Sequence, residues 1–210
     1  KLRPMKYSLL LALPALLAAP FLLSDGTAAS AAAPSTSSTA LKPAAFKMDA
    51  THSWILFKVN HLGLGTAWGS FNKFDGSFML DSENVSDNSV SLTIDAGSVD
   101  TNNKKRDDHL KGPDFFNAKE FPSISFTSSK VTGKGDDFQV TGTLTVLGKE
   151  KEITADMKMV GEGEDPWGNY RAGFEGSFTL DRTDFGMDFM KDGGLGTEVS
   201  VTLAFEGVRE

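Results

Sequence analysis

Residues 174–181 read FEGSFTLD, and residues 199–206 read VSVTLAFE. Apolar and polar side chains alternate in both stretches, which places an apolar row on one face of a β-strand and a polar row on the other. The chain has 16 Phe but only 2 Tyr, and Phe carries no polar group that needs a partner. Such strands predict a dry, apolar interior, which is either packed solid or holds an apolar guest.

The same alternation continues through most of the chain beyond residue 46. The eight predicted strands are 46–62, 69–81, 89–96, 123–131, 137–147, 152–160, 170–181 and 197–207. Turn signals such as Gly133 to Asp136 and Gly148-Lys149 separate them. We therefore predict an all-β fold, an eight-stranded antiparallel barrel whose interior has room for side chains or for one small ligand. Its long strands favour an extended guest over a compact one.

A single short helix is predicted between the third and fourth strands. Thr101 or Asn102 would cap it, and Gly112-Pro113 would end it after Leu110. Because its side chains are mostly charged, we expect it at the rim of the barrel. The polar run at 106–109 could suggest acid–base catalysis, but consecutive helical residues point in different directions. Capping and salt bridges that fix the helix to the rim fit these residues better.

The first 31 residues have the three parts of a secretory signal peptide. Met5-Lys6 precedes an apolar run from Leu9 to Leu23, and Ala29-Ser30-Ala31 provides a cleavage signal. The run is short for a membrane span of about 20 residues, so an uncleaved anchor is the less favoured alternative. Residues 1–4 precede the first Met, residues 32–45 form a Ser/Ala/Pro-rich flexible leader, and 46–210 form one domain.

Cleavage after Ala31 removes three basic residues and one acidic residue from totals of 21 and 28, leaving a net charge of about −9. This charge argues against nucleic acid or an anionic lipid surface as a partner, since basic patches supply that attraction. The chain has no Cys, which excludes a lipid-modified N-terminal Cys. We expect an exported periplasmic protein without stable membrane insertion. A homodimer through exposed strands or rim loops is compatible with this sequence.

Inward-facing aromatic residues are the candidates for contact with a guest. The rows contribute Phe57, Phe74, Phe78, Phe126, Phe174 and Phe178, which either line a cavity or form a packed core. Phe115-Phe116 follows the helix stop, and we expect this pair to plug the barrel mouth and contact the guest. His61 continues the inward row of Phe57 and Val59, so it either donates to a ligand head group or is a core histidine.

Motifs for catalysis or for metal binding are weak or missing in the sequence. The histidines are His52, His61 and His109, and they lack an HExxH-like spacing. The glycines at 193–196 are not followed by a predicted helix and therefore indicate a turn rather than a phosphate-binding loop. We predict no metal site, no catalytic residue and no cofactor. Two alternatives stay open: an enzyme of lipid or quinone metabolism that uses His61 and His109, and a packed barrel that acts as an interaction module for a membrane partner.

Five segments together resemble one protein family. They are HSWILFKVNHL at 52–62, RDDHLKGPDFF at 106–116, FPSISF at 121–126, VTGTLTVLG at 140–148 and RTDFGM at 182–187. In this order they resemble the YceI family of bacterial, mostly periplasmic proteins, over essentially all of 46–210. The resemblance implies a lipocalin-like barrel that holds a polyisoprenoid, an isoprenoid quinone or another long amphiphile, without enzymatic activity. The polar loop 161–169 is a departure that could alter one rim.

The sequence therefore predicts non-enzymatic binding, with transport or storage, of a long-chain isoprenoid or fatty lipid in the periplasm. The predicted ligand-binding residues are Phe57, Val59, His61, Phe74, Phe78, Phe115, Phe116, Phe126, Phe174, Phe178 and Phe185.

Overall fold

The computed structural model describes residues 43–210, so the predicted signal peptide and most of the leader lie outside the described residues. Strand segments make up most of this part of the chain. They are β1 (Ala44–Met48), β2 (Trp54–His61), β3 (Gly65–Phe71), β4 (Phe74–Leu80), β5 (Ser89–Asp95), β6 (Val99–Asp100), β7 (Ser123–Lys134), β8 (Asp137–Val146), β9 (Lys149–Glu164), β10 (Tyr170–Asp181) and β11 (Leu195–Arg209). The segments between strands contain three short 3₁₀ helices and one α-helix: η1 (Val85–Asp87), η2 (Ala96–Ser98), η3 (Arg182–Phe185) and α1 (Lys104–Leu110).

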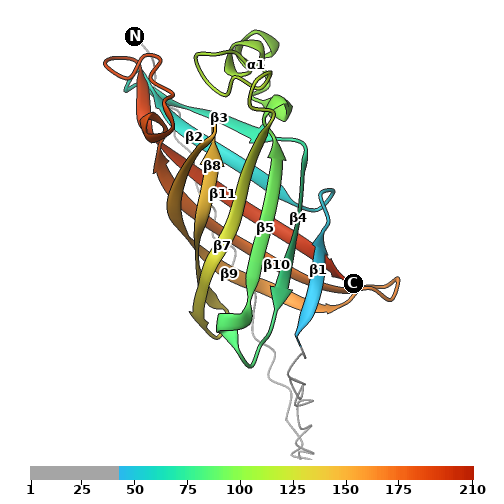
Figure 1. Ribbon diagram of the computed structural model, residues 1–210. Coiled ribbons are helices and arrows are strands. Elements are labelled where there is room, and N and C mark those ends of the chain that lie inside the picture. The colour runs from blue at the N-terminus through green and yellow to red at the C-terminus, as the bar shows by residue number, and fades with distance from the viewer. Residues whose placement is uncertain (1–42) are drawn as a thin grey trace, which may run out of the picture. The chain divides into compact units, whose positions relative to one another are not determined.

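The strands form a closed antiparallel barrel (Figure 1). Within residues 43–210, eight segments follow one another around the ring in the order β1-β4-β5-β7-β8-β9-β10-β11, and β11 pairs again with β1. The remaining segments lengthen strands of this ring. β1 and β2 pair with successive parts of β11. β4 pairs with β1, and β3 pairs with β2. β5 and β6 pair with β4 and β3 in the same manner. The predicted eight-stranded antiparallel barrel is confirmed, and three of its strands are divided into two segments each: β1 and β2, β3 and β4, and β5 and β6.

Alternation along the strands produces the inside and the outside of the barrel. On β8, Phe138, Val140, Leu144 and Val146 are buried, while Gln139 and Thr143 are exposed. The turn between β8 and β9 has only two residues, Leu147 and Gly148, whose φ angles of 52° and 70° suit a type I′ hairpin. Tight turns of this kind keep neighbouring strands in one register, so the apolar rows meet across the barrel.

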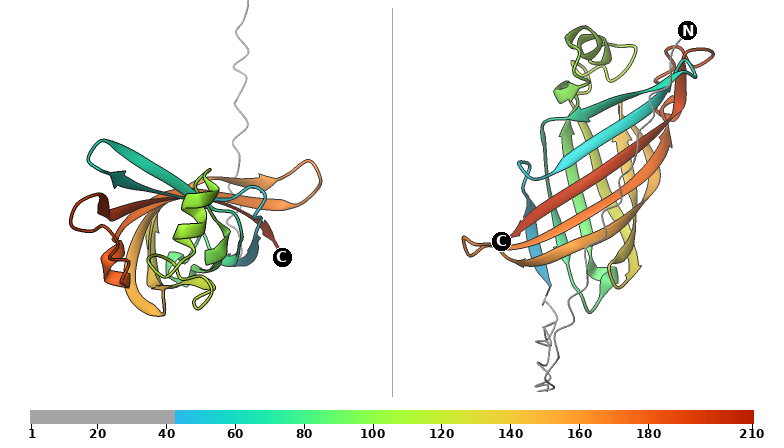
Figure 2. Two further views of the ribbon diagram at one scale, coloured as in Figure 1. Left: turned by 90° about the horizontal axis from the view of Figure 1, so that it is seen from above. Right: turned by 180° about the vertical axis from the view of Figure 1, so that it is seen from behind.

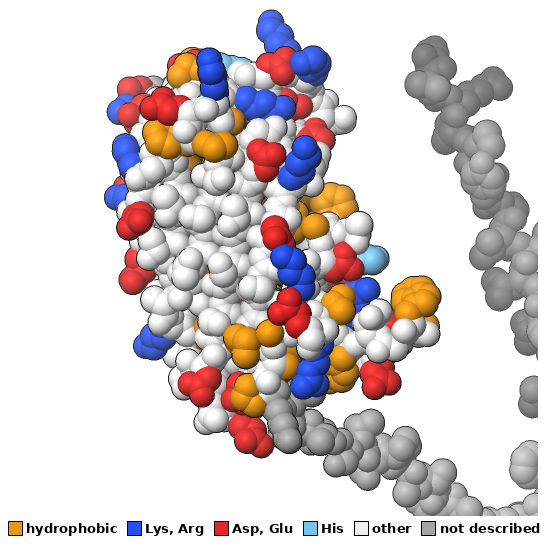
Figure 3. Space-filling model, turned by 45° about the vertical axis from the view of Figure 1, so that its right-hand side comes forward, with side chains coloured by type: hydrophobic (Ala, Val, Ile, Leu, Met, Phe, Trp, Pro, Cys, Tyr) orange, Lys and Arg blue, Asp and Glu red, His pale blue; other side chains and the backbone are white. Residues whose placement is uncertain are grey.

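The outer surface is mainly polar. Figure 3 shows one face of the molecule, on which apolar side chains lie in small groups between acidic and basic ones. Large exposed apolar residues in the described part of the chain include Trp54, Leu64, Trp68, Val160 and Trp167. No helix among these residues has the length and apolar character needed to cross a bilayer.

Helix α1 lies over one end of the barrel, as the view from above shows (Figure 2). Its cap is Asn103, whose side chain accepts a hydrogen bond from the backbone N–H of Arg106 at 3.0 Å, and not Thr101 or Asn102 as predicted. Thr101 holds the helix instead. Arg106 donates from Nε to Thr101 Oγ1 at 2.7 Å, and Asp107 accepts from the Thr101 backbone N–H at 2.8 Å. These bonds tie α1 to the end of β6.

Several bulky inward side chains lie flat over a glycine of the neighbouring strand. Phe57 pairs directly with Gly69, and a Cβ added at Gly69 would lie 2.3 Å from Phe57 Cζ. Met157 pairs with Gly176 in the same way, and a Cβ added at Gly176 would lie 2.4 Å from the sulfur of Met157. Because the glycine has no side chain, the larger group rests against the wall of the barrel. The centre of the barrel therefore stays open.

Candidate ligand-binding cavity

The barrel encloses a cavity of about 220 Å³. Its lining comes from every strand of the closed ring and from the segment after α1. Of the described residues that line it, only Asn88, Ser89 and Arg182 are polar. The interior is therefore not packed solid, and a cavity with walls of this kind accepts an apolar guest far more readily than water, which needs several polar partners.

Most of the predicted site residues meet in this cavity. Those that line it are Phe57, Val59, Phe78, Phe115, Phe116, Phe126, Phe174 and Phe178. Phe57, Phe126, Phe174 and Phe178 are only partly buried although they face inward. This is the exposure that side chains show when they face an unfilled interior. Their role in ligand binding stays a prediction.

The structure places the other three predicted residues outside the lining. Phe185 in η3 is 1 % exposed and belongs to the packed core. Phe74 packs edge-on against Phe205, with ring centroids 6.4 Å apart. His61 is exposed at the end of β2, where its backbone pairs with Leu195. The period of two predicts that His61 points inward, but it is exposed at the end of β2. A role of these three residues in ligand binding stays a prediction.

The mouth below α1 is closed by aromatic side chains. Phe116 contacts Phe71 edge-on at a centroid distance of 5.3 Å. Phe115 is buried and lies 5.4 Å from Phe189 in the β10–β11 loop, measured between ring centroids. His109 packs on both Phe115 and Phe189, at 5.1 and 4.9 Å, and its Nε2 lies 2.8 Å from a carboxylate oxygen of Asp114. The Phe pair thus occupies the mouth, with Phe115 and Phe116 both facing the cavity.

Arg182 is the one charged residue of the described lining, and the sequence analysis did not predict it as a site residue. Only 3 % of it is exposed. Its Nε donates to the carbonyl oxygen of Gly196 at 2.8 Å, its Nη2 to that of Leu195 at 2.9 Å, and its Nη1 to that of Met187. Burial lowers the pKa of this guanidinium, an effect that the charge of Asp181 opposes. The sequence does contain a signal for this inward position, because Arg182 continues the period-two row of inward residues on β10.

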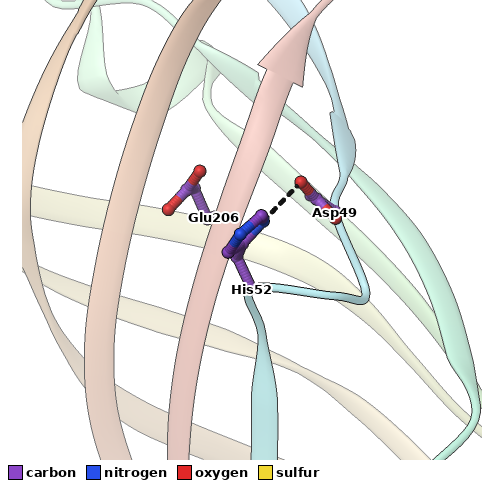
Figure 4. Close-up of side chains that lie close together, drawn as sticks. All are labelled: Asp49, His52 and Glu206. Atoms are coloured by element: carbon purple, nitrogen blue, oxygen red, sulfur yellow. Dashed lines mark hydrogen bonds and ion pairs between the residues drawn. The ribbon is translucent and has the colours of Figure 1, made fainter. Parts of the chain in front are cut away.

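A second polar cluster, Asp49, His52 and Glu206, lies at the bend between β1 and β2 (Figure 4). Its potential ligand atoms lie within 4.8 Å of one another. The positive charge that pairs with these carboxylates comes from Arg171. Its Nη1 lies 2.9 Å from Asp49 and 2.6 Å from Glu206, and its Nε lies 2.7 Å from Asp165. Hydrogen bonds from Arg171 hold the pKa values of Asp49 and Asp165 well below their usual range. The cluster has the chemistry of an ion-pair network that joins β10 and β11 to this bend.

Solved structures share this architecture. The crystal structure of BcnA from Burkholderia cenocepacia matches with a TM-score of 0.69 and 24% sequence identity, over 76% of this chain and 98% of that chain. The YCEI protein of Campylobacter jejuni matches with a TM-score of 0.63 and 26% identity, over 72% of this chain and 90% of that chain. A polyisoprenoid binding domain from Saccharophagus degradans matches with a TM-score of 0.60 and 15% identity, over 80% and 99% of the two chains.

Sequence relatives and a family model agree with this match. A UPF0312 protein of Pseudomonas aeruginosa is 46% identical over 159 residues, which are 76% of this chain and 83% of the relative. A UPF0312 protein of Pectobacterium atrosepticum is 42% identical over 165 residues, or 79% and 85% of the two chains. The model of the YceI-like domain matches residues 46–207. The chain therefore belongs to the YceI-like family.

Proposed function

We propose that this protein binds a long-chain amphiphile without transforming it, and that it stores or transports this lipid in the periplasm. The observation that carries the proposal is the closed barrel around an apolar cavity of about 220 Å³, in which only three lining residues among those described are polar. A polyisoprenoid, an isoprenoid quinone or a fatty lipid has the extended apolar shape that such a tube fits.

The hydrophobic effect gives this binding a sufficient driving force. Each methylene group of a lipid tail that leaves water contributes about 0.8 kcal/mol, and association and ordering offset several kcal/mol of the sum. A long tail therefore binds much more tightly than a short one, which suits storage or transfer of a lipid.

The relatives and the predicted export signal support the same proposal. The Saccharophagus degradans domain, which shares the fold, is described as polyisoprenoid-binding. The segment Met5 to Ala31 has the parts of a secretory signal peptide. A lipid that moves through an aqueous compartment needs a carrier that shields its chain from water, which is the role we propose for the barrel.

The two alternatives from the sequence have less support. An enzyme that used His61 and His109 would need them beside a shared substrate, yet His61 is exposed outside the cavity lining and His109 is bonded to Asp114 at the rim. A packed interaction module would need a filled interior, yet the barrel holds a cavity. We therefore propose a binding protein and not a catalyst.

The test is native mass spectrometry of the full chain after export into the periplasm of a bacterial host, followed by organic extraction. We expect one bound lipid per chain, with a long isoprenoid or acyl tail. A protein of apo mass that also takes up neither polyprenols, quinones nor fatty acids on incubation would overturn the proposal. Export itself is checked by the N-terminal sequence of the periplasmic protein, which should begin after Ala31.

A further inference from the structure

Arg182 is the one charged residue among the described residues that line the mainly apolar cavity. It lies in η3, directly after β10, and is 3 % exposed. Its three hydrogen-bond acceptors are the backbone carbonyls of Met187, Leu195 and Gly196. Carbonyl dipoles stabilise a guanidinium but carry no net charge. A buried charge is normally paired with an opposite charge, because an unpaired one has a high desolvation cost.

No carboxylate of residues 43–210 forms an ion pair with Arg182, and the two whose charges act on it, Asp181 and Asp188, are engaged elsewhere. Asp181 accepts from the backbone N–H of Thr183 at 2.8 Å and from its hydroxyl at 2.6 Å. Asp188 contacts Lys191 at 3.3 Å. Both act on Arg182 only through longer-range attraction. Arg171 shows the contrast, since three carboxylates surround that partly exposed arginine.

The guanidinium also retains hydrogen-bonding capacity. A guanidinium has five N–H donors, and three of the Arg182 donors have acceptors within the described part of the chain. The two residues beside it, Met187 and Leu195, line the cavity with it. Thus a positive charge with donors to spare lies at the wall of the cavity.

The position of Arg182 defines a direction along the tube. Phe174, Phe178 and Leu180 precede it on the inward row of β10, and all three line the cavity. From Phe174 to Arg182 the strand covers about 26 Å at roughly 3.3 Å per residue. Phe174 in turn contacts Phe138, with ring centroids 6.0 Å apart. The cavity therefore has a cationic group beside η3, while aromatic rings of β8 and β10 meet at the other end of this row. Asn88 and Ser89, the other two polar residues of the described lining, carry no charge.

We propose that Arg182 receives an acidic headgroup, a carboxylate or a phosphate monoester, and that the tail of the same molecule runs along β10 toward Phe174. This inference rests on the proposed function and specifies its ligand class. A guanidinium binds carboxylate and phosphate oxygens through charge-assisted hydrogen bonds. A neutral alcohol or quinone can accept such a bond but leaves the buried charge uncompensated.

The test compares ligands that differ only in the headgroup. Hexadecanoic acid, hexadecyl phosphate and hexadecan-1-ol are titrated into delipidated wild-type protein at pH 7.5 and monitored by calorimetry. We expect both anionic ligands to bind at least about tenfold more tightly than the alcohol. Acetate and inorganic phosphate, which lack the tail, should not bind measurably, because the apolar tail supplies most of the free energy.

Two variants separate the headgroup role of Arg182 from a structural one. Arg182→Met should remove the difference between acid and alcohol while alcohol affinity stays within about threefold, since the apolar contacts remain. Lys191→Met removes an exposed cation of the same loop and should retain the preference. If wild-type protein binds acid and alcohol equally, the headgroup proposal is wrong and lipid binding stands. If it binds none of the three long-chain ligands, the headgroup proposal is wrong, and the proposed function fails as well when polyprenols and quinones do not bind either.

A second measurement needs no variant and covers the case in which Arg182→Met does not fold. Hexadecanoic acid labelled with carbon-13 at the carboxyl is bound to wild-type protein and titrated by NMR. We expect the pKa of the bound carboxyl to lie below the ordinary value of a carboxylic acid, because the guanidinium favours the anion. A pKa raised above the ordinary value of a carboxylic acid would show desolvation without the cation and would overturn the proposal.

Discussion

Glycine residues beneath bulky side chains determine how much of the barrel interior stays open. Gly69 is the clearest case, because a Cβ there would lie 2.3 Å from Phe57 Cζ. We predict that Gly69→Ala turns the Phe57 ring toward the cavity, lowers the free energy of unfolding by about 1–3 kcal/mol and weakens binding of a 16-carbon acid. Calorimetry and urea unfolding measure both effects.

Gly161 in β9 provides the matched control for Gly69. A Cβ added at Gly161 meets no atom within 4 Å, so Gly161→Ala should leave both ligand affinity and stability close to wild type. If Gly69→Ala and Gly161→Ala had equal effects on affinity and stability, the Phe57 ring would not depend on the missing side chain at Gly69.

Arg171 makes part of the stability dependent on pH. It lowers the pKa values of Asp49 and Asp165, so both carboxylates bind fewer protons in the folded than in the unfolded protein near pH 3–4. Their contribution is complete above the unfolded pKa of about 3.9 and is lost as pH falls toward the folded values. We predict that Arg171→Met lowers Tm at pH 7 and that the Tm difference from wild type narrows steadily below about pH 4. A difference that is constant from pH 7 to pH 2.5 would contradict this account.

At the scale of elements, two segments that are distant in the sequence meet at the mouth of the barrel. The segment after α1 contributes Phe115, and the β10–β11 loop contributes Phe189, with His109 packed on both rings. These contacts hold the segment that closes the cavity. We predict that a bound lipid leaves through this mouth, so the contacts should control its release more than its affinity.

We predict that Phe189→Ala speeds the release of a fluorescent fatty acid several-fold while stability changes by less than about 1 kcal/mol, because the side chain is partly exposed. Stopped-flow dilution into acceptor vesicles measures the rate. Trp167→Ala is the control, since Trp167 is 82% exposed in the β9–β10 turn and makes no ring contact among the described residues. An unchanged release rate in Phe189→Ala would place the exit elsewhere.

The boundaries of the strands and of the helix show which parts of the fold the sequence pattern predicts. The period of two gave the eight long strands, because one face of each is buried in the barrel. It did not reveal the bends, since the apolar pattern continues across them. At the bend after β1, Ser53 donates from Oγ to the Asp49 carbonyl at 2.8 Å, a local bond that leaves no periodic signal. The cap at Asn103 was missed by one residue, because three polar residues in succession could each serve.

The cavity shows where sequence reasoning was insufficient at the scale of the whole molecule. Of the eight predicted residues that line it, six belong to periodic rows, and Phe115 and Phe116 come from the segment after α1. Arg182 was missed because it follows the last apolar residue of its row, where a charge normally meets solvent. The carbonyls of Met187 in the β10–β11 loop and of Leu195 and Gly196 at the start of β11 hold it in a buried position. His61 is the opposite case, a residue in the inward register on a strand that extends past the barrel.

The open interior makes the stability of the whole barrel depend on its ligand. A ligand that binds only the folded state stabilises it by RT ln(1 + [L]/Kd), which is about 2.7 kcal/mol at a free concentration of 100 Kd. Delipidated wild-type protein should therefore unfold at a clearly lower temperature than the same protein with saturating lipid. Scanning calorimetry with and without hexadecanoic acid measures this shift.

Filling the cavity should remove that dependence. Ala155 on β9 is buried and lines the cavity, whereas its neighbour Thr154 is exposed on the outer face. We predict that Ala155→Phe occupies space that the lipid would use, so its Tm no longer responds to lipid, while Thr154→Phe keeps the wild-type response. The apo form of Ala155→Phe should remain folded, because an unfilled apolar cavity tolerates added bulk better than a packed core. If Ala155→Phe retained the full shift, the lipid would bind outside the barrel and the cavity would not be the site.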